Sequence, residues 1–152
     1  MCRQGDAKRR ISWQPTKPVE LPFHELVWDN IAQERSFGDH TKVSHLYCPW
    51  LGFHFVYSLT NESATAIIAT ITYTFNYIEL QFGIKVKILK IDGESSLING
   101  NEFDEFKRDK GIIIKVSAPN VHEQHGRAER SGGVLTSRAI KLKLASNLPD
   151  HV

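Results

Sequence analysis

Residues 64–92, ATAIIATITYTFNYIELQFGIKVKILKID, decide the fold because they join a long helical pattern to a strand that ends on an acid. From Ala64, apolar residues recur at helical spacing over about five turns and predict one helix over 62–82 with a single buried face. The expected N-cap is Asn61 or Thr60, and Gly83 is expected to end the helix in the left-handed conformation. The apolar positions are Ile67, Ile68, Ile71, Phe75, Ile78 and Phe82.

The second part of this stretch, residues 84–92, alternates apolar residues with lysines and then runs apolar into Asp92. The alternation predicts a strand that delivers Asp92 at its carboxyl end. Two parallel neighbouring strands need a connection of a dozen or more residues, and the helix before this strand supplies it.

The rest of the chain predicts an element order of βββαβαβα. Three antiparallel strands come first, and a short helix with Phe103 and Phe106 inward follows the fourth strand. The final helix is expected to bury Ala128, Leu135, Ala139 and Leu142. The ranges are strands 23–31, 41–48, 53–59 and 111–119, a helix at 101–110 closed by Gly111, and a last helix at roughly 127–146.

Gly132 and Gly133 stand inside that last helix. Together they cost about 2 kcal/mol of helix stability relative to alanine. We therefore expect close packing of this turn on the sheet to hold it in place.

Length and composition predict a single domain, since 152 residues with 41% hydrophobic content can bury one core. Residues 1–20 are polar and basic and are expected to form an extended arm, with the core over 21–152. The two cysteines, Cys2 and Cys48, lie in no metal-finger spacing, which favours a reducing compartment. With no signal peptide and no run of about 18 apolar residues, we expect no membrane partner.

A formal charge of +2 does not by itself indicate nucleic acid, but basic residues gather in three segments. They lie in the amino-terminal arm, in the strand that leads to Asp92, and in the last helix. Solvated surface is the ordinary explanation of any one cluster. Because two of the three flank acids, we favour contacts with phosphates.

Three acids stand at the expected elements: Asp29 in the first strand, Asp92 at the end of the fourth, and Glu129 in the last helix, with 36 residues between the latter two. An isolated acid is usually a surface or capping residue. Carboxylates from several elements are, however, the oxygen ligands that a two-metal phosphoryl-transfer site requires.

The texts KIDGESSL (90–97) and SAPNVHEQHGRAERSGG (117–133) resemble the catalytic core of integrases from copia-type retrotransposons with long terminal repeats. The resemblance implies a ribonuclease H-like fold of class α/β, like that of retroviral integrases. Its mixed five-stranded sheet has helices on both faces, and the first and fourth strands are neighbours. It also implies that Asp29, Asp92 and Glu129 bind two Mg²⁺ or Mn²⁺ ions. The chain departs from the family text at Asn120, Val121, His122 and His125.

The family activity would be DNA integration, by processing of DNA 3′ ends and strand transfer. The resemblance implies DNA partners (element ends and target DNA), with RNA as a further partner, a homo-oligomer, and a nuclear location with a cytoplasmic particle stage. MCRQGDAKRRIS (1–12) resembles the text after the last cysteine of the family's zinc finger, so Cys2 would be an orphaned ligand and no zinc site is expected. The expected nucleic-acid contacts are Lys90, Gln124, His125, Arg127, Arg130, Arg138 and Lys141.

Alternatives stay open at this point. Glu94 and Glu123 compete with the three acids as ligands. His122 and His125 lack the i, i+4 spacing of a helical zinc motif and are expected to lie in a flexible loop that also contains Gly126. The chain could also be a degenerate integrase relic that binds nucleic acid without catalysis, or a ribonuclease H-type hydrolase.

Overall fold

The computed structural model describes residues 21–32, 38–92, 97, 100–117 and 122–146, with the backbone alone of Asp92, Ser117 and residues 122–131. The expected arm at 1–20, with Cys2, and the strand end at Pro119 lie outside these residues. The strands are β1 (Glu25–Ala32), β2 (Lys42–Cys48), β3 (Phe53–Leu59), β4 (Ile88–Asp92) and β5 (Ile113–Ser117). The helices are α1 (Ala64–Phe82), α2 (Asn101–Lys110) and α3 (His122–Ala145).

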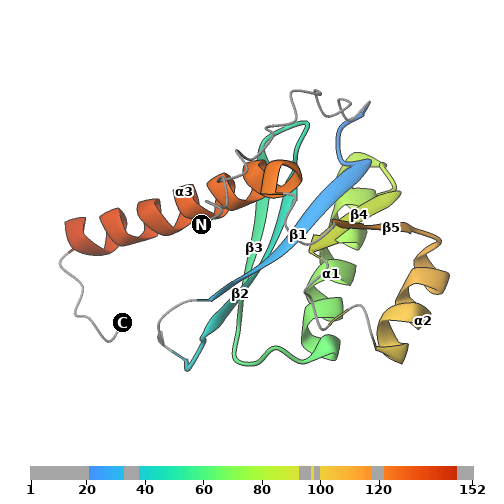
Figure 1. The fold of residues 1–152 in the computed structure, drawn as a ribbon, viewed down its shortest axis with the longest axis horizontal. Helices are drawn as coiled ribbons and strands as arrows, with labels where there is room; N and C mark the ends of the chain where they lie inside the picture. The colour runs from blue at the N-terminus through green and yellow to red at the C-terminus, as the bar shows by residue number, and fades with distance from the viewer. Residues whose placement is uncertain (1–20, 33–37, 93–96, 98–99, 118–121, 147–152) are drawn as a thin grey trace, which may run out of the picture.

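The five strands form one mixed sheet in the order β3-β2-β1-β4-β5. β1, β2 and β3 pair antiparallel as a meander, whereas β4 pairs parallel with both β1 and β5. Figure 1 shows α1 and α2 together on one side of this sheet and α3 crossing the strands on the other. The predicted fold class is therefore confirmed, including the neighbouring position of β1 and β4.

Helix α1 forms where the apolar spacing predicted it, and Gly83 ends it with φ of 66°. The predicted cap was wrong: Ser63 is the N-cap, and its hydroxyl accepts a hydrogen bond from the Ala66 amide. Asn61 instead accepts one from the Ser63 amide, so it shapes the turn before the cap. Phe82, expected in the buried face, is 47% exposed, although its ring stacks on Phe23 at 5.0 Å.

The core lies between the sheet and the helices α1 and α2. Ile71 and Ile78 of α1 are fully buried, and Phe75 contacts the Phe106 ring of α2. Phe103 is fully buried as well, which confirms the inward face predicted for α2. Gly111 ends α2 at φ of 62°, where a side chain would be strained.

The fourth strand begins later than predicted, at Ile88 rather than Ile84. Val86 is buried and Ile84 is partly buried, so the alternation reflects real packing. Residues 84–87 nevertheless lack a partner strand, because β1 begins only at Glu25, level with Ile88. The amides of Lys87 and Ile88 both donate to the His24 carbonyl at 3.0 Å, which marks the point where pairing starts.

Helix α3 begins at His122, five residues before the predicted start, and includes Gly126, which we expected in a loop. Its first half crosses the sheet, and its second half runs beyond the strands (Figure 1). Ala139 and Leu142, expected to be buried, are therefore exposed, and Leu135 is only partly buried; Ala128 lies outside the described side chains. Within the described residues, no helix has both the length and the apolar character to cross a membrane.

Candidate active site

Asp29 lies on β1, and its side chain is on the face of the sheet that α3 covers. Trp28, beside it, points the other way and donates its indole N–H to Ser44 Oγ at 2.9 Å, which in turn contacts Thr70 of α1. Because successive side chains on a strand alternate between faces, Asp29 and Ile31 share the opposite face. The Asp29 side chain is half-buried there.

Asp92 ends β4 directly beside β1. The parallel register pairs Val27 with Lys90, and two residues further along both strands stand Asp29 and Asp92. Neighbouring strands lie about 4.8 Å apart. The two acids therefore follow the last register pair of neighbouring strands by the same number of residues. The Asp92 side chain lies outside the described residues.

Helix α3 packs against β1 close to Asp29, at Gly132. A Cβ added at Gly132 would lie 3.1 Å from the Ile31 Cδ1 atom, tighter than an ordinary contact, whereas one at Gly133 would meet nothing within 4 Å. Close packing of the turn is thus confirmed for Gly132 alone. Glu129 stands three residues before Gly132, less than one turn of the helix. The backbone of Glu129 is therefore within one turn of the contact with β1.

The Glu129 position differs from the expectation in one respect. With the helix starting at His122, Glu129 lies nearly two turns into α3 rather than one. His122 and His125 belong to the same helix, so the expected flexible loop is wrong at these positions. Continuous helical hydrogen bonding through Gly126 outweighs its intrinsic cost of about 1 kcal/mol. The side chains of Glu123 and Glu129 lie outside the described residues, as does Glu94.

A pair of histidines, one of them buried, lies beside Asp29. His45 of β2 pairs in register with Asp29 and is fully buried, and its Nε2 lies 3.0 Å from His54 Nδ1. Burial, and to a smaller extent the neighbouring His54, lower the pKa of His45 from 6.5 to about 4. Burial and the Arg138 charge lower the pKa of His54. His45 and His54, which lie on the β2 side of Asp29, are therefore uncharged at neutral pH.

Lys90, expected to contact nucleic acid, shares the sheet face of Asp29. Its ammonium contacts the Glu25 carboxylate at 2.8 Å, and Lys115 of β5 contacts the other oxygen of that carboxylate at 3.4 Å. Sequence patterns did not single out Glu25, Lys115 or His45. Only the register of the strands brings them to the site, and no local signal in the sequence reports that register.

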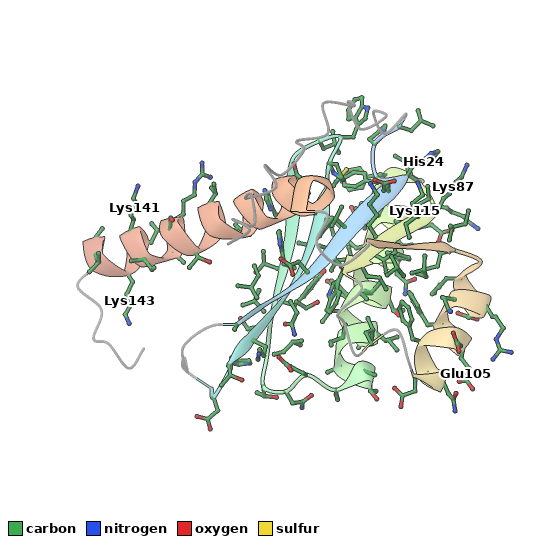
Figure 2. All side chains as sticks on the ribbon, viewed as in Figure 1. His24, Lys87, Glu105, Lys115, Lys141 and Lys143 are labelled. Carbon is green, nitrogen blue, oxygen red and sulfur yellow. The ribbon has the colours of Figure 1, made fainter. Side chains whose placement is uncertain are left out.

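The basic residues predicted on α3 divide into two groups. Arg138 and Lys141 are exposed, and Lys141 stands about 18 Å further along the helix than Glu129 at the usual rise per residue. Figure 2 shows it on the part of α3 that extends beyond the strands. The side chains of Gln124, His125, Arg127 and Arg130 lie outside the described residues.

The expected ligands are three carboxylates, and hard divalent cations prefer oxygen ligands of this kind. Among the side chains that the structure describes, no group of three or more His, Cys, Asp or Glu residues is placed to hold a metal ion. Asp29 is the one member of the expected triad whose side chain is described.

No protein-family model matches the chain. Solved structures of integrases do match its fold. The chain is similar to the integrase in the simian T-cell lymphotropic virus intasome with PP2A regulatory subunit B56 gamma, with a TM-score of 0.74 and 16% identity over 88% of this chain. It spans 46% of the length of that protein.

Two isolated catalytic cores match as well. The magnesium-bound HTLV-2 integrase core in its dimeric form has a TM-score of 0.66 and 18% identity, over 86% of this chain and 79% of that one. The BIV integrase core has a TM-score of 0.62 and 15% identity, over 82% and 73% of the two chains.

The chain has the ribonuclease H-like fold. In this fold, Asp29 lies on β1, Asp92 ends β4, and Glu129 lies in the first half of α3. At these levels of identity the match establishes the fold alone.

Proposed function

We propose that this chain is the catalytic core of a DNA integrase of the copia retrotransposon type, acting through Asp29, Asp92 and Glu129. The observation that supports the proposal is the parallel pairing of β1 with β4, whose last register pair, Val27 with Lys90, stands two residues before Asp29 and Asp92 on their strands. Glu129 lies within one helical turn of Gly132, which packs against Ile31 of β1, and this position supports Glu129 as the third ligand. The reaction would be phosphoryl transfer on DNA ends.

The three carboxylates would hold two Mg²⁺ or Mn²⁺ ions. When bound, such ions stabilise charge on the attacking and leaving oxygens of a phosphodiester. In end processing, the oxygen of water forms the new bond to phosphorus as the bond to a DNA 3′ oxygen breaks. In strand transfer, the oxygen of the processed 3′ hydroxyl instead forms the new bond to a phosphorus of the target DNA, as the bond from that phosphorus to a target 3′ oxygen breaks.

The protein's own part is to fix the carboxylates. Asp29 stands on a strand that is paired on both sides, by β2 and by β4. Its neighbour Trp28 is locked by the hydrogen bond to Ser44, and fully buried His45 packs the adjacent strand. A strand held in this way keeps a ligand oxygen in place without a conformational search, which favours reaction over mere binding.

The test is a disintegration assay, in which purified protein rejoins a branched DNA substrate in the presence of Mn²⁺ or Mg²⁺. Among the expected reactions, this one asks least of segments outside the core. The parent is expected to give a metal-dependent product, and Asp29→Asn, Asp92→Asn and Glu129→Gln none. The matched control is Glu105→Gln, which changes an exposed acid of α2, a helix that carries none of the three proposed ligands. This variant should remain active.

If the folded parent binds DNA but gives no product with either metal, the integrase assignment fails and a noncatalytic relic is favoured. If hydrolysis occurs without strand joining, the chain acts as a ribonuclease H-type hydrolase. Strand joining that survives Asp92→Asn would exclude the proposed metal site.

Partners and location follow from the same proposal. DNA would be the substrate, in the form of element ends and target DNA, and RNA a further ligand of the basic surface. A homo-oligomer fits the dimeric and trimeric forms of the HTLV-2 core. We place the protein in the nucleus, with a cytoplasmic particle stage, and sedimentation of purified protein tests the oligomer directly.

A further inference from the structure

Glu25 lies at the centre of a charged cluster on the face of the sheet that carries Asp29. Its side chain is only 7% exposed, and its two carboxylate oxygens contact different lysines. Lys90 comes from β4 and Lys115 from β5, where the two are register partners. Three neighbouring strands thus contribute one charged side chain each to a single cluster.

The cluster holds more positive charge than the buried acid needs. One ammonium is enough to neutralise Glu25, and the second leaves a net positive charge. Each ammonium has three donors and gives one to Glu25. The Lys115 side chain is 51% exposed and that of Lys90 24%, so both have donors left for an anion from solvent.

This cluster lies next to the acids. Lys90 precedes Asp92 by two residues on β4, which is about 7 Å along a strand. On β5, Lys115 precedes Ser117 by the same distance, and Ser117 is the register partner of Asp92. An interval of about 7 Å equals about two nucleotides of rise along one strand of DNA.

The part of the sheet around Lys115 is open. Helix α3 contacts β1 and β2. On the same face of β5, two residues before Lys115, Ile113 is 60% exposed. In Figure 2, Lys115 lies beside Lys87 and His24 at the end of the sheet where β1 and β4 begin, and backbone hydrogen bonds join these segments.

We propose that Lys90 and Lys115, held in position by Glu25, bind a phosphate of the nucleic-acid backbone about two nucleotides from the one that reacts at the acids. The strand would then run from the Asp29 corner across β4 and β5. This inference rests on the proposed function and adds to it the path of the substrate. Glu25 acts as a positioning residue, because it touches the lysines rather than the phosphate.

The test uses Lys115→Gln, which changes an exposed side chain. Binding to a labelled duplex DNA is measured by fluorescence anisotropy over a series of salt concentrations. Loss of one phosphate contact should lower the slope of log affinity against log salt by about 1 and weaken binding several-fold at low salt. Lys107→Gln is the control, since this lysine is also paired with an acid but lies on α2, on the opposite face.

Glu25→Gln separates phosphate binding from a purely structural ion pair. The amide keeps the shape of the side chain and removes the negative charge, so the freed lysines should bind DNA more tightly and with a steeper salt slope. A structural role alone predicts lower stability with unchanged DNA binding. That result, or a Lys115→Gln protein with the affinity and slope of the parent, would overturn the proposal.

Asp92→Asn distinguishes this inference from the proposed function. If Asp92→Asn abolishes strand joining while Lys115→Gln leaves binding unchanged, the integrase assignment stands and the phosphate site fails. If Lys115→Gln lowers the slope but the parent joins no DNA, the phosphate site stands and the catalytic assignment fails.

Discussion

The buried histidine beside Asp29 should make folding stability depend on pH in a defined window. His45 is fully buried, its Nδ1 has no hydrogen-bond partner among the described residues, and its pKa is lowered from 6.5 to about 4. The folded protein therefore keeps this side chain neutral where the unfolded chain protonates it. Because the unfolded state binds more protons, stability is fully present above pH 6.5 and is lost as pH falls toward 4.

The magnitude follows from the two pKa values. Their gap corresponds to about 3 kcal/mol when fully expressed, and about 2 kcal/mol of it is lost between pH 7.5 and pH 5. The measurement is urea unfolding at a series of pH values, for the parent and for His45→Gln, which cannot titrate. The free energy of unfolding of the parent should fall by about 2 kcal/mol more than that of the variant over this interval.

Comparison of the two proteins cancels the carboxylates and other histidines, which titrate in both. His54→Gln is the companion variant: it removes the charge that adds to the lowering of the His45 pKa but leaves burial, the larger cause, in place. Its pH profile should therefore keep most of the fall. Parallel profiles for the parent and His45→Gln would refute the reasoning.

Three further predictions concern stability in urea at neutral pH. Gly133→Ala should stabilise by up to about 1 kcal/mol, because its Cβ meets open space, whereas Gly132→Ala should gain less or lose stability against the sheet. Ser63→Ala should cost about 1 kcal/mol through loss of the α1 cap, seen as a lower urea midpoint. Ser44→Ala should cost about 1–3 kcal/mol, because it leaves the buried Trp28 N–H without its acceptor, and tryptophan fluorescence reports the change.

Local patterns in the sequence were enough for most of the elements. The apolar spacing predicted the extent of α1 to within two residues. Gly83 and Gly111, both left-handed, predicted the carboxyl ends of α1 and α2. Strand β3 has the predicted bounds. These features depend on the chain segment itself, so no knowledge of distant residues was needed.

The errors came where tertiary context decides. The start of β4 depends on where β1 offers a partner, and Leu142 is exposed because α3 is longer than the sheet is wide. Gly126 indicated a loop by propensity, yet the helix continues through it.

The site divides in the same way. The resemblance indicated Asp29, Asp92 and Glu129, and the strand order places the first two on neighbouring strands. Glu25 and Lys115 stand 90 positions apart and meet only because β1, β4 and β5 are adjacent with a particular register. A pattern read along the chain cannot supply that register.

The central claim, that Asp29 and Asp92 share a metal site, is tested most directly by Mn²⁺ binding to the protein without DNA, followed by electron paramagnetic resonance of the free ion. The parent should bind Mn²⁺, and Asp29→Asn and Asp92→Asn should each weaken binding about tenfold or more, because each removes a charged oxygen ligand. Glu105→Gln should bind as the parent does. Equal affinity in the parent and in both aspartate variants would contradict the account.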